Sequence, residues 1–455
     1  MIRNMELTRR DALRVGAGSL LCSLAHATPV FRLATFRVDA TPPAGEPLIW
    51  SVPLVKVEEP LWAKGIVLED GTTRYVLCAI DWCEITNGSE LTFRRKLAAA
   101  AGTDPSRVAI QTVHQHAAPY ADSDAHKLLD QAPDPPLHLS NKLLEDLTDR
   151  LADAIKKSLA QLQAFDRIGT GEAKVDRVAS TRRIHGPDGK IIVRYSDGGA
   201  DPELAAAPEG FIDPLLKTIT LASGNKPLVR LHYYATHPQT FCCDGRASSD
   251  FVGIARETLE RNEKVFQIYF TGCAGNVTAG KYNDGTPAAR EGLSQRLLAG
   301  MEASIASTRF APARQLKWRT VPLVLPLRAD PGYTVADFRR RLEDPKGNPG
   351  SRVYLGAMAL AFAERIQRPL ELSSLEIGKV HILHLPGEPL LEFQMYAQHL
   401  KPQHFVAVAG YGDCGTGYIC TDRAFVEGGY EPTDANVGPG SEALLKKAIR
   451  QLLGE

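Results

Sequence analysis

The sequence has no excess of charge of either sign. Its 455 residues contain 53 Lys and Arg against 53 Asp and Glu, so the formal net charge is zero. Long runs of like charge, low-complexity tracts and repeats of fixed period are also absent. Such a chain has no strong field that would draw it to nucleic acid or to acidic lipid, and we expect neither as a partner.

Two common signatures of catalytic or metal-binding proteins are missing. No Gly-x-Ser-x-Gly nucleophile elbow is present, which disfavours a serine hydrolase. None of the eight cysteines has a Cys-x-x-Cys zinc spacing. We expect most of these cysteines to be small buried side chains, and the sequence leaves a Cys414–Cys420 disulfide open.

A hydrophobic run long enough to cross a membrane is missing too. The apolar stretch from Val15 to Ala25 is well below the ~20 residues that a span needs. It follows Thr8–Leu13, which is close to a twin-arginine motif, and it precedes small residues suited to cleavage. We therefore predict a twin-arginine-type (Tat) export signal at residues 1–30 and a periplasmic or secreted protein. The alternative is an ordinary helix capped by Thr8.

After residue 30, short apolar runs alternate with amphipathic segments, and 44% of the chain is hydrophobic. The expected strands are Arg74–Asp81, Arg107–Thr112, Leu228–Tyr234 and Val265–Phe270. The expected helices are Ser89–Ala101, Ser140–Leu162, Asp250–Asn262 and Ser441–Leu453. Because no linker is evident, we predict an α/β fold with one layered domain over residues 31–455. A central mixed sheet would be flanked by helices, with the active site at the strand ends.

Histidines follow two of the expected strands. His114 and His116 lie two residues apart beyond Thr112, so an extended backbone would turn both to one side. His237 ends another apolar strand just before Pro238. Such residues could be metal ligands, or merely polar residues and a structural histidine at strand ends.

A carboxylate and two tyrosines stand in comparable places. Glu388 lies at a turn from a strand into a helix, where a helix dipole would also favour it. Tyr418 belongs to the glycine-dense stretch 410–421, which could wrap a site or form a surface loop, and Tyr430 follows it. Two histidines and one glutamate form a common catalytic zinc set that leaves a position open for water.

The order and spacing of these motifs resemble the catalytic domain of neutral ceramidases. The likeness begins at Val38–Pro43, similar to that family's opening V-D-I-T-P-P, and ends near Tyr430. The segment 112–119 is similar to the family's T-H-T-H-S-G-P. The resemblance implies that residues 31–455 are a catalytic domain that binds one zinc ion per chain. The implied zinc ligands are His114, His237, Glu388 and Tyr418.

The same resemblance assigns roles to residues around the metal. It implies that His116 shuttles protons and that Arg183 and Tyr430 contact the substrate carbonyl, with Arg182 in place of Arg183 if the alignment shifts by one. Residues expected behind the ligands or in the substrate pocket are Asp250, Asn276 and Thr278, with Asp244 as a further candidate.

The resemblance implies a metal-dependent amidohydrolase acting on linear amides, with a place in sphingolipid or other lipid metabolism. Its substrate would be a lipid or small-molecule N-acyl amide. Thr278 stands where ceramidases carry a serine, Ala117 and Ala118 replace Ser-Gly, and the family's C-terminal β-sandwich is absent from the sequence. A different amide, a lactam or an ester therefore stays open as the substrate, as does a non-catalytic exported binding protein. Two-metal chemistry would need a bridging carboxylate such as Asp81, and His and carboxylate ligands admit several divalent ions.

Overall fold

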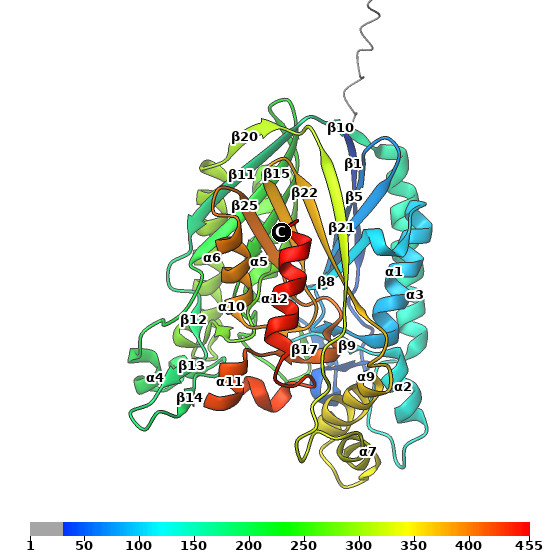
Figure 1. Ribbon diagram of the computed structural model, residues 1–455, viewed down its shortest axis with the longest axis vertical. Helices are drawn as coiled ribbons and strands as arrows, with labels where there is room; N and C mark the ends of the chain where they lie inside the picture. Colours follow the sequence, from blue (N-terminus) through cyan, green and yellow to red (C-terminus); the bar gives the residue numbers. More distant parts are fainter. Residues whose placement is uncertain (1–30) are drawn as a thin grey trace, which may run out of the picture.

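The structure is a computed structural model that describes residues 31–455 (Figure 1). The proposed export signal at residues 1–30 lies outside the described residues. Three mixed sheets, with helices packed on them, make up most of the described chain. The predicted α/β class with mixed sheets and flanking helices is therefore confirmed, and its strands are divided among three sheets.

The first sheet has the strand order β10-β1-β5-β6-β8. All its pairs are antiparallel except β6 with β8, because helix α1 carries the chain back between these two strands. Its elements are β1 (Phe31–Asp39), β5 (Trp62–Glu69), β6 (Arg74–Ile80), α1 (Asn87–Ala101), β8 (Val108–Thr112), α2 (Ser123–Asp130), α3 (Asn141–Ser158) and β10 (Gln163–Phe165).

The second sheet repeats this arrangement with the order β20-β11-β15-β16-β18, and only β16 and β18 are parallel. Its elements are β11 (Arg167–Lys174), β15 (Leu215–Ser223), β16 (Lys226–Tyr234), α5 (Asp250–Glu263), β18 (Phe266–Thr271), α6 (Pro287–Ala306) and β20 (Arg309–Pro312).

The third sheet has the order β21-β22-β23-β25, and β23 and β25 are its parallel pair. Its elements are β21 (Leu316–Leu323), β22 (Leu370–Ile377), β23 (Val380–His384), α10 (Leu391–Leu400), β25 (Phe405–Ala409) and α12 (Ser441–Leu452). Three successive parts of the chain thus share one topology: three antiparallel strands, a helix, and a fourth strand parallel to the third.

The inner faces of the three sheets share one hydrophobic core. Leu33, Leu77, Leu231 and Ile382 come from all three sheets and pack into it. The opposite face of the first sheet packs against α1 and α3, and that of the third against α10 and α12 (Figure 1). Because both faces of these strands are buried, their sequences read as nearly continuous apolar runs.

The helices begin and end where the sequence supplies the local chemistry. The Ser140 side chain accepts a hydrogen bond from the backbone N–H of Leu143 and starts α3. Gly102, in the left-handed conformation with φ 68°, ends α1. The leucine stripe expected on one face of α3 is buried against the first sheet.

The three parallel strand pairs end close to one another. The backbone N–H of Thr112, at the end of β8, donates to the carbonyl of Tyr411 beyond β25 at 2.8 Å. Gly410 donates in turn to the carbonyl of Thr271, the last residue of β18, at 2.9 Å. The carboxyl ends of the parallel strands of all three sheets therefore meet in one region of the molecule.

Short elements close the space beyond these strand ends. They are β7 (Glu84–Ile85), β9 (Tyr120–Ala121), β12 (Ser180–Thr181), β19 (Val277–Thr278), β24 (Glu388–Pro389), β26 (Tyr418–Ile419), α7 (Val335–Glu343), α8 (Pro349–Ser351), a π-helical turn (Arg352–Met358) and α9 (Ala359–Glu364). The remaining connections contain β2 (Pro47–Leu48), β3 (Val52–Pro53), β4 (Lys56–Val57), β13 (Arg183–His185), β14 (Ile191–Val193), α4 (Pro202–Ala206), β17 (Arg246–Ala247) and α11 (Asp422–Glu427).

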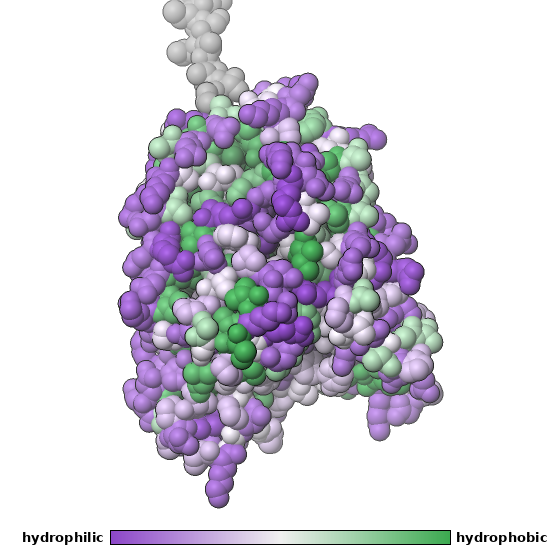
Figure 2. Space-filling model, turned by 180° about the vertical axis from the view of Figure 1, so that it is seen from behind, coloured by the Kyte–Doolittle hydropathy of each residue, from purple (hydrophilic) through white to green (hydrophobic). Residues whose placement is uncertain are grey.

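The free cysteines are buried, and the surface seen from behind is mainly hydrophilic. Cys414 and Cys420 are both buried and free, so the disulfide left open by the sequence does not form, and adjacent Cys242 and Cys243 are bonded instead. On the face seen in Figure 2, hydrophilic side chains predominate and hydrophobic ones are interspersed. Among residues 31–455, no helix has both the length and the apolar character required to traverse a bilayer.

Candidate metal and active site

Four of the predicted site residues meet where the three sheets end. His114 follows β8 of the first sheet and His237 follows β16 of the second. Glu388 in β24 and Tyr418 in β26 follow the last two strands of the third sheet and pair with each other in register. All four side chains are buried. Each comes from a different strand end, so only the assembled fold brings them together.

The ligand atoms lie at mutual distances suited to a small cation. Glu388 Oε2 is 3.1 Å from Nε2 of His114 and 3.1 Å from Nε2 of His237. The two Nε2 atoms are 3.2 Å apart, and Tyr418 Oη is 3.5 Å from Nε2 of His237. Four atoms bound tetrahedrally at zinc's usual 2.0–2.1 Å would be roughly 3.3 Å apart. The two imidazoles and the carboxylate therefore fit zinc in both chemistry and spacing, and Tyr418 Oη lies close to the expected distance from one of them.

Backbone carbonyls fix which nitrogen of each imidazole faces the site. Nδ1 of His114 is 2.8 Å from the carbonyl of Cys83, and Nδ1 of His237 is 2.7 Å from the carbonyl of Ala274. A carbonyl can only accept, so each Nδ1 carries a proton, and in the neutral form of each ring Nε2 presents a lone pair. Two lone pairs and a carboxylate converge here, and a cation between them would relieve their mutual repulsion.

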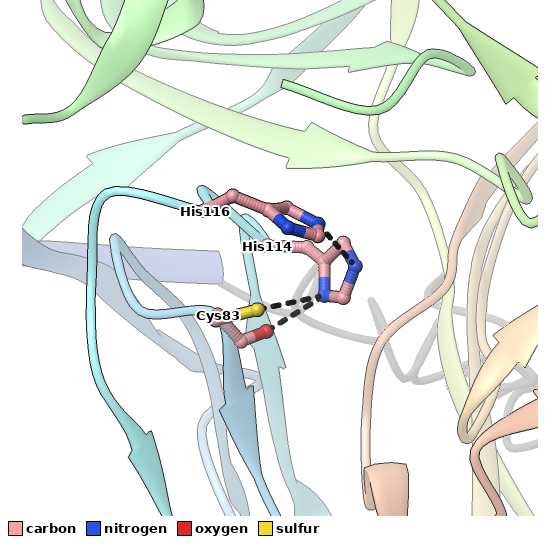
Figure 3. A group of neighbouring side chains, drawn as sticks. All are labelled: Cys83, His114 and His116. Carbon is pink, nitrogen blue, oxygen red and sulfur yellow. Dashed lines mark hydrogen bonds between the residues drawn. The ribbon is translucent and has the colours of Figure 1, made fainter. Parts of the chain in front are cut away.

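Cys83 lies beside Nδ1 of His114, at the opposite edge of the ring from the Nε2 atom that His116 contacts (Figure 3). Its sulfur is 3.7 Å from Nδ1 of His114, the nitrogen that already donates to the Cys83 carbonyl. Cys83, His114 and His116 lie close enough to be considered as a metal group. Nε2 of His114 faces His237 and Glu388, whereas Nδ1 faces Cys83. The carbonyl of Cys83 therefore orients the imidazole, and the Cys83 sulfur does not lie on the side of the candidate ligand atoms.

Burial and neighbouring charge set the protonation states of His237 and Glu388. Burial, and then the positive charge of Arg182, lowers the pKa of His237 to about 4, so its imidazole is neutral at pH 7. Burial opposes ionisation of Glu388, but the neighbouring His114 and His237 hold its pKa well below the usual range. The site therefore combines neutral imidazole with carboxylate.

His114 is held in an uncommon backbone conformation. Its φ is 69°, in the left-handed region that non-glycine residues seldom adopt, and its ring stacks on Tyr411 with centroids 4.3 Å apart. Tyr411 also has a positive φ of 62°, and its hydroxyl is 3.5 Å from Nδ1 of His237. Such conformations cost about 1–3 kcal/mol each and persist where the surroundings impose them, commonly at functional sites.

His116 lies beside the four candidate ligands, which we call the ligand group: His114, His237, Glu388 and Tyr418. One nitrogen of its ring has no protein partner among the described residues. Its Nε2 is 3.3 Å from Nε2 of His114, and no described residue bonds its Nδ1. Burial, followed by the nearby imidazoles of His114 and His237, lowers its pKa well below the usual value. The ring is therefore uncharged at neutral pH.

The two adjacent arginines face different partners. Nη1 of Arg182 donates to Tyr418 Oη at 2.8 Å, and its guanidinium lies 5.1 Å from the centroid of the Tyr430 ring. Arg183 turns away into ion pairs with Glu431 at 2.7 Å and Glu427 at 3.1 Å. The structure thus brings Arg182 to the ligand group and leaves Arg183 outside it, because adjacent residues of an extended segment point to opposite sides.

Three further predicted residues support the site from outside the ligand group. Thr278 forms a parallel bridge with His237. Asn276 accepts from the backbone N–H of Leu391 at 2.8 Å, which holds the start of the helix after Glu388. Asp250 accepts from both the N–H and the hydroxyl of Thr240, so it fixes the loop that follows His237.

Two acidic candidates serve elsewhere. Asp244 pairs with Arg246 in the loop that leads into β17. Asp81 is paired with buried Arg256 through two bonds of 2.8 and 2.7 Å, so it does not bridge metals at the ligand group.

A small cavity of about 30 Å³ opens beside the ligand atoms. Its lining residues are Ile49, Trp50, Cys83, Glu84, His114, His116, Tyr120, Tyr354, Glu388, Tyr418 and Tyr430. Trp50, Glu84 and Tyr354 were not anticipated from the sequence. Glu84 follows strand β6 much as Glu388 follows strand β23. This repetition is the one signal in the sequence that could have identified Glu84 as a cavity residue. A larger cavity of about 530 Å³ on the Arg183 side contains none of the four candidate ligands.

The described chain is similar in fold to ceramidases of known structure. Scans against protein families and curated proteins found no match. The neutral ceramidase from Pseudomonas aeruginosa superposes with a TM-score of 0.69 at 16% identity, covering 93% of this chain and 75% of that chain. A ceramidase complexed with C2 gives 0.68 and 16%, covering 92% and 74%. These superpositions confirm the ceramidase-like fold that the sequence led us to expect. At 16% identity the similarity supports the fold alone.

Proposed function

We propose that this protein is a metal-dependent hydrolase that cleaves the amide bond of an N-acyl substrate. A single zinc ion per chain would be held by His114, His237, Glu388 and Tyr418. The observation that carries the proposal is the pair of imidazoles whose Nε2 atoms, fixed by backbone carbonyls, both lie 3.1 Å from one carboxylate oxygen. The fold shared with ceramidases supports the amide as the scissile bond.

Zinc bound here would polarise the substrate carbonyl and lower the pKa of water to roughly 7. His116, neutral and beside the ligands, would accept a proton from the attacking water and pass it to the leaving amine. Such a proton shuttle typically contributes 10²–10⁴ in rate.

Charge that develops on the carbonyl oxygen needs a donor, and we assign that role to Arg182 with Tyr430 beside it. Arg182 is buried and already bonds the phenol of Tyr418, so its guanidinium is held in place before substrate binds. Burial, and then the carboxylate of Asp434, raises the pKa of Tyr430, so its phenol keeps the proton and can donate. Arg183, which the sequence favoured for this role, instead anchors the chain around Tyr430 through Glu427 and Glu431.

We further propose that residues 31–455 form the catalytic domain and that residues 1–30 direct Tat-type export to the periplasm or beyond. The substrate would be a ceramide or a smaller N-acyl amide. The cavity beside the ligands, about 30 Å³, has room for roughly one water molecule, so the acyl chain would extend away from it.

The proposal is tested first by metal content. Purified protein loaded with zinc and freed of excess is analysed by elemental mass spectrometry as wild type, as His237→Ala and as His384→Ala. His384 is the matched control: it is also buried at a strand end, and among residues 31–455 its ring hydrogen-bonds only to Ser373. We expect one zinc per chain in the wild type and the control and none in His237→Ala. A wild type that stays metal-free contradicts the proposal.

The second test is the reaction itself. Zinc-loaded wild type is given a labelled ceramide, a short-chain N-acyl amide, a lactam and an ester in parallel. Release of fatty acid from either linear amide supports the assignment. Turnover of only the lactam or the ester would move the protein to another hydrolase class, and absence of all turnover by a zinc-loaded protein would favour a binding role.

A further inference from the structure

Glu84 is a buried carboxylate in the active-site cavity that the proposed mechanism does not use. It is only 2% exposed, and it lines the same cavity as His114 and Glu388. The hydroxyl of Tyr354 lies 3.3 Å from its Oε1. Its Oε2 has no donor among residues 31–455. An acceptor buried in this way calls for a hydrogen-bond partner.

The internal repetition of the fold explains how this carboxylate reaches the cavity. Glu84 in β7 pairs in parallel with Tyr120 in β9, just as Glu388 pairs with Tyr418. The first and third sheets therefore place the same Glu–Tyr ladder pair beyond their parallel strands. The third sheet's pair belongs to the ligand group, whereas Glu84 sits on another part of the cavity wall.

The wall around Glu84 is otherwise aromatic. The Tyr354 ring lies 5.7 Å from Trp50 and 5.7 Å from Tyr120, measured between centroids. The Tyr120 hydroxyl accepts from the backbone N–H of Trp50 at 2.7 Å. This surface offers apolar contact and one unpartnered carboxyl oxygen, which suits a short carbon segment that bears a hydroxyl or amino group.

Trp50 and its neighbour keep this wall in place. Trp50 and Ser51 have φ values of 59° and 63°, and Gly350 lies so close to Trp50 that a Cβ there would be 2.6 Å from its ring. The close approach packs the Trp50 turn against the segment that carries Tyr354. The aromatic wall is thus built from two distant parts of the chain that hold each other against Glu84.

We propose that Glu84 is a specificity-determining residue whose Oε2 accepts a hydrogen bond from a hydroxyl or amino group of the substrate. Because the cavity is small and contains both Glu84 and the ligand group, the donor lies within a few bonds of the scissile amide. The inference rests on the proposed function and adds to it the kind of amine portion that the enzyme selects.

The experiment compares three amides that differ at one position. N-acylethanolamine carries a hydroxyl, N-acylethylenediamine carries an amine, and N-acylethylamine carries neither. The readout is the ratio of kcat/KM for each donor-bearing substrate to that of N-acylethylamine. Zinc-loaded wild type is measured beside Glu84→Leu, Glu84→Gln and the control Glu90→Gln, which changes a buried glutamate bound to Arg94 in α1.

We expect the wild type and the control to favour at least one donor-bearing amide by about 10- to 100-fold. Glu84→Leu should bring that ratio close to one, and Glu84→Gln, which keeps an amide oxygen, should give an intermediate ratio. A preference for the amine identifies an ammonium as the recognised group, and a preference for the hydroxyl identifies a neutral donor. A merely structural role for Glu84 would lower kcat/KM for all three amides alike and leave the ratio unchanged.

Failure of the inference and failure of the proposed function give different results. If the wild type hydrolyses the amides without discriminating among them, the role of Glu84 is refuted while the hydrolase assignment stands. If no amide is cleaved, calorimetric titration of the zinc-loaded protein with the same three compounds decides the matter. Tighter binding of a donor-bearing compound that is lost in Glu84→Leu supports the site, and equal binding of all three refutes it.

Discussion

Replacing Arg182 and Arg183 separately should damage the protein in two different ways. Arg182→Met removes the donor that bonds Tyr418 at 2.8 Å and faces the cavity residue Tyr430. Loss of one such donor from a developing oxyanion typically costs 10²–10³ in kcat, or about 2.7–4 kcal/mol. We therefore expect a fall of that size in kcat at saturating substrate.

Arg183→Met should instead lower stability. It breaks an ion pair with Glu431, whose side chain is fully buried, and leaves that carboxylate without its cation. Breaking a buried pair in this way costs about 3–5 kcal/mol of unfolding free energy. Urea unfolding followed by circular dichroism should show this loss, whereas kcat of the folded fraction should change by only a few-fold.

The two readouts are measured on both variants, with Arg182→Lys as a third. Lysine keeps the charge but not the planar fork of donors, so it should recover only part of kcat. If Arg183→Met lowers kcat about a hundredfold while Arg182→Met leaves it near the wild-type value, the assignment of the carbonyl donor is refuted.

Three further outcomes follow from the structure. Removal of zinc by a chelator should lower the Tm by roughly 3 °C for a chain of this size when zinc had been present at about 100 times its Kd, and calorimetry that shows no shift would contradict binding by the folded state. Gly417→Ala should reduce bound zinc, because Gly417 directly precedes Tyr418, has φ 58°, and would carry a Cβ that collides with the carbonyl of Asp434. Full zinc content in a folded variant would contradict this. Burial lowers the pKa of His232 to about 4, so this histidine must gain a proton on unfolding below its ordinary pKa near 6.5, and stability is lost as pH falls through that window. The unfolding free energy of wild type relative to His232→Gln should therefore fall by about 2 kcal/mol between pH 7 and pH 5, and a constant difference would show that the pKa of His232 is the same in the folded and unfolded states.

Three of the proposed ligand residues could be anticipated because each follows an apolar strand. His114, His237 and Glu388 are polar residues at places where a buried strand ends, and α/β folds collect such ends at one edge. The sequence could not show that three sheets contribute to that edge. Their pairing joins residues far apart in the chain, and a pattern of buried runs does not specify which strands are neighbours.

The choice between Arg182 and Arg183 shows a second limit. In an extended segment one step along the chain reverses the direction of the side chain, so a motif that is aligned one residue off selects the wrong face. Trp50 and Tyr354 show a third limit, because they reach the cavity only through packing between distant segments. No local pattern around either residue distinguishes it from an ordinary core aromatic.

The most direct test of the account is X-ray absorption at the zinc edge of the purified, zinc-loaded protein. Ligation by His114, His237, Glu388 and Tyr418 predicts only nitrogen and oxygen neighbours, at about 2.0–2.2 Å, with the scattering pattern of two imidazoles. A sulfur neighbour at about 2.3 Å would place the metal at Cys83 instead and contradict the proposed ligand set.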